Sequence, residues 1–392
     1  MLNSRIYFIE KILRQVVGVL VFFLAANFLS PTNFANYNLI LVTIAIFSPL
    51  LFFVQEPILI RFANQQRKIT TFLIFQSFFT LIFILAMIAC EQGLTVFLIF
   101  LMPMALLRIY DLKRYQNFYK NLPDQNGIID LMSNMITFPI KLISLKLDSI
   151  NLLATCILLD YFLPSLLFAI QRELHFRQDK FFNSFKKKYL PITPKVISVV
   201  MLLCLPAFFA GILQGIGTRL VFHFAEETMS TLYLAAFFIL IRMIDFSASV
   251  VNICAPIIQV QFQLLSKTEG QLRLRTLLLI AIVFLASSIL SYVLFKTAYL
   301  IFPLYYKILV EYLVFLPPVV TLMTANLFTN ILHYERSQTI TILCKSMILV
   351  VVMAILISFP FDLNISSILL AFILSYTLQL ILSVWRLNVL SL

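Results

Sequence analysis

At residues 171–195 the chain reads QRELHFRQDKFFNSFKKKYLPITPK, its longest polar stretch, with seven basic residues. The segments on both sides are long and apolar. Hydrophobic residues make up 61% of the 392 residues, whereas charged residues make up only 12%. Soluble domains carry about 25% charged residues. The composition therefore predicts an all-α polytopic membrane protein whose two halves are joined by a basic linker.

The apolar segments on either side have the length of membrane spans. A hydrocarbon core about 30 Å thick needs about 20 apolar residues in a helix. On this basis we expect about 12 transmembrane helices, six on each side of the linker. The expected spans are 12–29, 36–60, 69–90, 94–113, 126–146, 149–171, 196–222, 229–262, 274–296, 308–333, 338–359 and 364–388.

The links between these spans are alternately basic and poor in basic residues. The positive-inside rule produces this alternation when a chain crosses a bilayer repeatedly. It predicts that both termini and the linker 172–195 are cytoplasmic, between lobes 1–171 and 196–392. The net charge of +12 then needs no nucleic acid, because anionic lipid headgroups suffice as partners. No small-residue cleavage site follows the first span, so we expect it to be retained.

A weak internal repeat supports two lobes of the same orientation. FLSPTNFANY at residues 28–37 joins the first two spans, and FAEETMSTLY at 224–233 joins the seventh and eighth. The two stretches are 196 positions apart, half the chain, and the Phe-to-Tyr spacing is equal. Two six-helix lobes related as parallel repeats are a known transporter plan.

Ionisable residues inside the spans are the candidate functional residues, because each costs about 2.5–3.5 kcal/mol to insert. Arg242 and Asp245 are spaced i,i+3 near the middle of a span, so they share one helix face. They either form a pair that locks helix packing or present a cation to an anionic substrate. The candidate cavity residues are Arg14, Lys141, Asp160, Arg219, Arg242, Asp245 and Lys345. The candidate ion-coupling residues are Glu56, Asp130 and Asp160.

Motifs of soluble enzymes are absent from the sequence. It holds no Walker loop, GxGxxG or HExxH motif and no CxxC pair. We therefore expect no cofactor, no metal and no enzymatic activity. Transport without an ATP site must be driven by an ion gradient or by substrate supply and removal.

The sequence resembles Wzx-type O-antigen flippases, members of the multidrug/oligosaccharidyl-lipid/polysaccharide exporter superfamily. RQVVG at residues 14–18 followed by FLSPTNFANY is similar to the first helix pair of that family. GTR at 217–219 followed by YLA at 233–235 resembles its pattern at the start of the second half. The sequence departs from the family at Asn27, Ala35 and Thr218, where the family often has Arg, Gly and Asp.

The resemblance implies two six-helix lobes around a cationic cavity in the bacterial inner membrane. The implied substrate is an undecaprenyl-diphosphate-linked glycan, flipped to the periplasmic leaflet by alternating access. Arg14, Arg219 and Arg242 would attract the diphosphate, and Asp160 would serve the sugars or ion coupling. A polysaccharide polymerase and a chain-length regulator would be further partners.

Two alternatives remain open at the level of sequence. A cation-coupled multidrug antiporter of the same superfamily would use acids in the first half, such as Glu56, Asp130 and Asp160. A membrane glycan polymerase or ligase would place a large arginine-bearing loop outside, and the short outer links expected here disfavour it.

Overall fold

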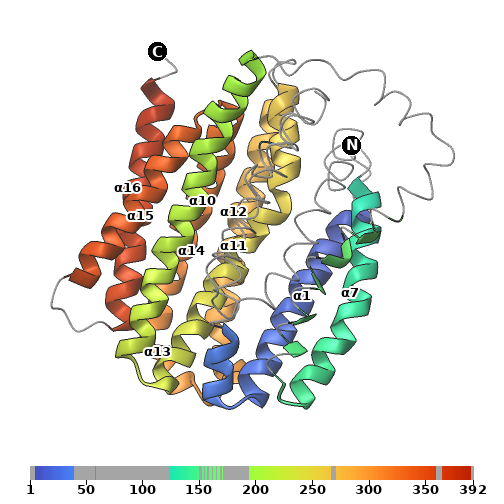
Figure 1. Cartoon of the computed structure of the whole chain (residues 1–392), viewed down its shortest axis with the longest axis vertical. Coiled ribbons are helices and arrows are strands. Elements are labelled where there is room, and N and C mark those ends of the chain that lie inside the picture. The colour runs from blue at the N-terminus through green and yellow to red at the C-terminus, as the bar shows by residue number, and fades with distance from the viewer. Residues whose placement is uncertain are drawn as a thin grey trace.

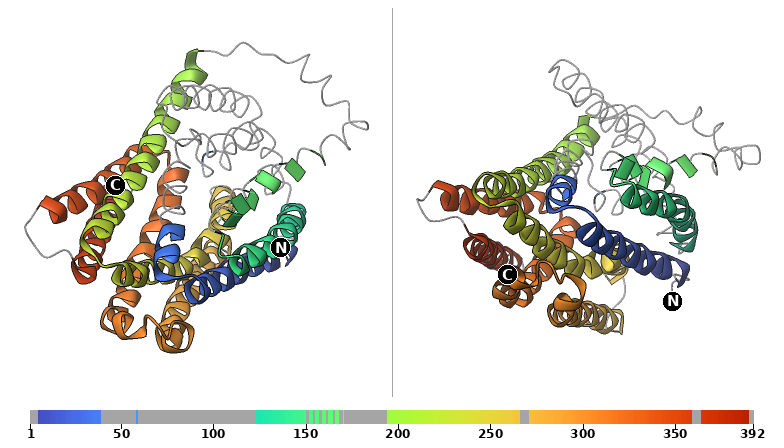
Figure 2. Two further views of the ribbon diagram at one scale, coloured as in Figure 1. Left: turned by 60° about the horizontal axis from the view of Figure 1, so that its bottom comes forward. Right: turned by 90° about the horizontal axis from the view of Figure 1, so that it is seen from below.

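The computed structural model describes residues 5–38, 58, 123–149, part of 152–170, 194–265, 271–358 and 364–389. These residues form a bundle of mostly long helices, with no strand among them (Figures 1 and 2). The helices are α1 (Arg5–Phe28), α7 (Pro123–Lys146), α10 (Pro194–Thr228), α11 (Thr231–Leu265), α12 (Gln271–Ile301), α13 (Tyr306–Tyr312), the 3-10 turn η2 (Leu313–Phe315), α14 (Leu316–Glu335), α15 (Thr339–Ser358) and α16 (Ile365–Val389).

Seven stretches of these helices are long and apolar enough to cross a membrane. They are Asp124–Lys146, Ile197–Gly217, Thr231–Pro256, Ile280–Ile301, Tyr306–Tyr334, Thr339–Ser358 and Ile365–Leu387. Each overlaps one of the expected spans, so the chain is an all-α, multi-pass membrane protein. The expected span 12–29 is helical as part of α1. The expected spans 36–60, 69–90 and 94–113 lie outside the described residues, apart from the helical residue 58, and 149–171 is described only in part.

The expected span 308–333 is not one continuous helix. α13 ends at Tyr312, η2 follows, and α14 begins at Leu316 with prolines at its first positions. Proline lacks the N–H that a helix interior needs, but the first helical turn has no use for that donor. Pro317 and Pro318 therefore start a helix instead of kinking one.

A helix–turn–helix occurs in each of the two stretches, but the two turns are not at the expected spacing, and the repeat of two whole lobes stays a prediction. A bend at residues 29–30 and another at 229–230 separate two helices each. The amide of Phe34 donates to the Ser30 carbonyl at 2.8 Å, and that of Leu234 to the Ser230 carbonyl at 2.9 Å. The matching positions are thus 200 residues apart, and not 196.

Burial follows the same 200-residue register. The pairs Val21 and Val221, Phe22 and Phe222, Ala25 and Ala225, and Ala35 and Ala235 are identical in type and buried in both copies. The expected offset of 196 aligned the aromatic residues at the ends of the two stretches. The structure instead aligns the small and apolar residues that fill the interior.

The helices define two ends of the bundle. The basic end is the one at which α10 begins and α16 ends, and Arg386 lies in the last turn of α16. The opposite end holds the turn between α10 and α11 together with α13 (Figure 1). There α1 joins the core of the second half: the Phe22 ring lies 5.3 Å from Phe34 and 6.2 Å from Phe302. One hydrophobic core therefore unites the two halves at the opposite end.

Candidate functional site

Arg242 and Asp245 form a charge pair in the middle of α11, about 17 Å from the start of that helix. Arg242 Nη1 lies 3.7 Å from Asp245 Oδ2, as the i,i+3 spacing predicts. Of the seven candidate spans, the one in α11 is the most enclosed, because 67% of its 18-residue apolar stretch is buried. The two side chains nevertheless keep 27% and 44% of their surface exposed. The exposed fractions do not decide between the two expected roles, a packing lock or a substrate contact, and both stay predictions.

Lys141 and Asp160 form a second ion pair, between α7 and the helical residues around 160. Lys141 Nζ donates to Asp160 Oδ2, and both side chains are mostly buried. The buried Tyr37 lies within electrostatic reach of both Asp160 and Arg242. Tyr37 thus lies near one ion pair from each half of the chain, and the common cavity stays a prediction.

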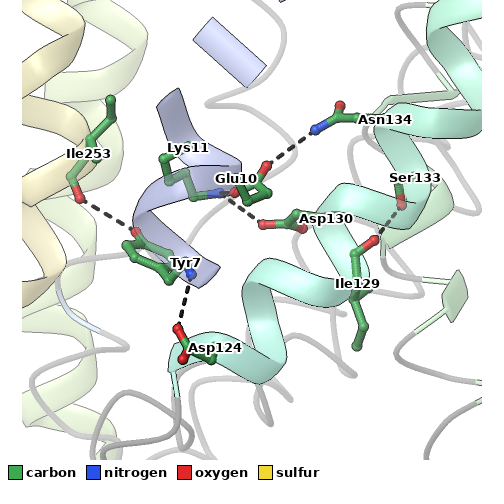
Figure 3. A network of polar contacts seen from close by, with 9 residues as sticks. All are labelled: Tyr7, Glu10, Lys11, Asp124, Ile129, Asp130, Ser133, Asn134 and Ile253. Carbon is green, nitrogen blue, oxygen red and sulfur yellow. Dashed lines mark hydrogen bonds and ion pairs between the residues drawn. The ribbon is translucent and has the colours of Figure 1, made fainter. Parts of the chain in front are cut away.

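Asp130 belongs to a buried polar cluster near the basic end, where α1 and α7 pack together (Figure 3). Lys11 Nζ lies 2.8 Å from Asp130 Oδ2 and 3.0 Å from Glu10 Oε2. Asn134 donates to Glu10 Oε1 at 3.2 Å. The two carboxyl groups are 0% and 1% exposed, so two acids share one ammonium inside the protein.

Glu10 and Lys11 were not among the expected functional residues, because they precede the first expected span. The detectable signal was the spacing of Glu10 and Arg14, one helical turn apart on α1, and the structure places the Arg14 charge within reach of Glu10. Burial raises the pKa of the Glu10 carboxyl, and the neighbouring Lys11 opposes that shift.

Tyr7 connects this cluster to the second half of the chain. Its backbone N–H donates to Asp124 Oδ1 on α7 at 3.0 Å. Its hydroxyl donates to the carbonyl of Ile253 on α11 at 3.5 Å. α1 therefore contacts α11 through a polar contact towards the basic end and through the aromatic core at the opposite end.

Lys345 lies apart from the other candidates, between α15 and α14, and is only 2% exposed. Its Nζ donates to Asn330 Oδ1 at 2.7 Å and to Thr329 Oγ1 at 2.8 Å. A third contact reaches the carbonyl of Asn326 at 3.4 Å. The side chain is enclosed by these oxygens, whereas the Arg242 side chain is 27% exposed.

The two remaining candidates have no described side-chain contacts. Arg219 lies on α10 without a described side chain, and Glu56 is outside the described residues. Within the described ranges, no group of three or more His, Cys, Asp or Glu residues could hold a metal ion.

Comparisons with known protein families, with curated proteins and with solved structures find no match for this chain. The functional argument therefore rests on the embedded charges and on the way the helices place them.

Proposed function

We propose that the chain is a flippase for an undecaprenyl-diphosphate-linked oligosaccharide, the repeat unit of an O-antigen or a similar surface polysaccharide. It moves this lipid-linked glycan from the cytoplasmic to the periplasmic leaflet of the bacterial inner membrane by alternating access. The basic end is the cytoplasmic end, so both termini are cytoplasmic. The observation that carries the proposal is the accessible Arg242–Asp245 pair in the middle of the most enclosed candidate span.

A diphosphate carries charge that the hydrocarbon core cannot solvate, so its path needs cations within the membrane. Arg242 is suited to this role, because a guanidinium binds phosphate through two parallel hydrogen bonds. Asp245 holds the cation while no substrate is bound. Lys141 is already neutralised by Asp160, so this pair is better suited to hydrogen bonds with the sugars. Arg14, nearer the basic end, attracts the headgroup before it enters.

The distribution of contacts between the two halves supports alternating access. Phe22 and Phe34 join the core of the second half at the opposite end. Towards the basic end, the Tyr7 hydroxyl of α1 donates a hydrogen bond to the Ile253 carbonyl of α11 at 3.5 Å. A bundle closed by an apolar core at one end and by a weaker polar contact at the other is suited to load substrate from the basic end.

A second candidate function is cation-coupled antiport of small organic molecules. It is favoured by the buried Glu10 and Asp130 carboxyl groups of the first half. Such acids bind protons or cations that drive export. Deletion of an antiporter would sensitise cells to toxic compounds and leave the surface polysaccharide intact.

The test is a gene deletion in the source bacterium, followed by complementation and a gel of the surface polysaccharide. We expect the deletion to lose the polysaccharide and the wild type to restore it. Arg242→Ala should restore it poorly, whereas Arg386→Ala, which removes an exposed arginine at the basic end, should behave as wild type. A normal surface polysaccharide in the deletion strain would refute the flippase proposal.

A further inference from the structure

Lys345 differs from the other lysines that the structure buries in the helices. Lys11 and Lys141 each contact at least one carboxylate. The described partners of Lys345 Nζ are an amide oxygen, a hydroxyl and a backbone carbonyl, all neutral. Lys345 lies about 9 Å along α15 from its start and is 98% buried.

The neutral partners of Lys345 allow both charge states of its amine. A carboxylate would hold the amine in its charged form, because it can only accept hydrogen bonds. The Thr329 hydroxyl can rotate, and the Asn330 amide can turn, so that either one can donate to the single lone pair of a neutral amine, whose two N–H groups still donate. A buried ammonium without a counter-ion is costly. Burial therefore reduces the free-energy difference between the charged and the neutral amine.

We propose that Lys345 is a proton-binding site that takes up and releases a proton. The role of this proton in transport rests on the flippase function proposed above, where it would supply the coupling ion. The amine gains a proton to become an ammonium with three N–H donors, and the ammonium loses that proton to become an amine with two N–H donors and one lone pair.

The change in charge alters the contact between two helices. α15 packs mainly against α10 and α16 and less extensively against α14. The hydrogen bonds of Lys345 to Thr329 and Asn330 therefore carry much of the described polar contact between α15 and α14. The ammonium holds the two helices together, and its deprotonation loosens them.

The helices packed around Lys345 carry several titratable groups, none of which is a carboxylate paired with Lys345 in the described part of the chain. On α14, His333 is fully buried, accepts or donates a hydrogen bond with Gln338 and lies within electrostatic reach of Lys345. The other titratable or charged residues of these three helices are Tyr334, Glu335 and Arg336 on α14, Cys204, Lys195, Arg219, His223, Glu226 and Glu227 on α10, and Tyr376 and Arg386 on α16. In the described part of the chain, no carboxylate forms an ion pair with Lys345.

Hydrogen–deuterium exchange of the purified full-length protein in detergent micelles tests the proposal. Exchange is followed from about pH 6 to about pH 10 and corrected for the intrinsic exchange rate. In the wild type, protection of the α14 and α15 amides near Lys345 should fall about tenfold as pH rises, since charged hydrogen bonds are lost. Lys345→Arg should remain protected throughout, and Lys345→Met should show no pH step. The control Lys296→Met removes an exposed lysine and should match the wild type.

A wild-type profile without a pH step, or the same step in Lys345→Arg, would overturn the proposal even if Lys345→Met fails to fold. Complementation separates it from the flippase function. Lys345→Arg should fail to restore the surface polysaccharide, because it keeps the charge but cannot release it. Full restoration by Lys345→Arg would refute proton exchange and leave the flippase proposal standing, whereas a normal polysaccharide in the deletion strain would refute only the latter.

Discussion

Gly127→Ala should force α1 away from α7, because Gly127 lies directly against the backbone of α1. A Cβ at this position would lie 2.8 Å from the Tyr7 Cα and 2.9 Å from its nitrogen. Favourable contacts between carbon atoms lie at about 3.5–4.0 Å, so α1 would have to move by about 1 Å. Overpacking of this kind costs about 1–3 kcal/mol. The shift would also strain the Tyr7 hydrogen bond to Asp124.

Two other glycines provide matched controls. A Cβ added at Gly18 would meet no neighbouring atom within 4 Å. Gly18→Ala should therefore stabilise the helix by about 1 kcal/mol. A Cβ at Gly217 would meet the Leu349 side chain at 3.3 Å, which can adjust. Gly217→Ala should therefore fall between the other two variants.

The assay is thermal unfolding of the purified protein in the presence of a thiol-reactive fluorescent dye. Cys156 and Cys204 are 0% exposed and become reactive only when their helices separate. Cys156 also contacts Ser144 of α7 at 3.7 Å, so it reports on that helix. We expect Gly127→Ala to melt about 2 °C or more below wild type. Equal melting temperatures for Gly127→Ala and Gly18→Ala would refute the close approach of α1 and α7.

Three further predictions concern charge and topology. Lys141→Ala should destabilise the protein by about 3 kcal/mol, because it leaves the mostly buried Asp160 unpaired, and a double-mutant cycle with Asp160→Ala should recover much of that loss. Reporter fusions at Lys187 and Asp362 should report opposite sides of the membrane; the same side for both would contradict the twelve-span topology. Because the pKa of Glu10 is raised, the folded state keeps the carboxyl proton to a higher pH than the unfolded state does. The free energy of unfolding therefore falls as pH rises above about 4.5. Glu10→Gln should therefore melt above the wild type at pH 8 but not at pH 4; a constant difference would contradict the assignment.

The positions of the seven helices that are long and apolar enough to cross a membrane could be predicted from the sequence. The reason is that the bilayer sets the length of an apolar helix. The Arg242–Asp245 contact was also predictable, since it depends only on helical spacing within one element. The sequence did not locate the boundaries between α13, η2 and α14 within 308–333. Apolar length alone cannot distinguish one helix from two when prolines start the second.

Contacts between helices were harder to predict than the helices themselves. The sharing of Lys11 by Glu10 and Asp130 joins residues more than 100 positions apart and depends on the close approach at Gly127. Lys345 was correctly placed inside a span, but its sequence neighbours gave no sign of the oxygens that α14 supplies. The two turns lie 200 residues apart, whereas the expected offset of 196 aligned the aromatic residues at the ends of the two stretches.

The 200-residue register allows each half of the chain to be compared with the other, position by position. The counterparts of Arg242 and Asp245 in the first half are Val42 and Ala45. Gene duplication would produce a helix–turn–helix that occurs twice at a constant offset. Only the second copy now carries this charge pair. Under the proposed function, the second half alone would supply this charge pair to the substrate, because the sequence has no charged residue at the matching positions of the first half.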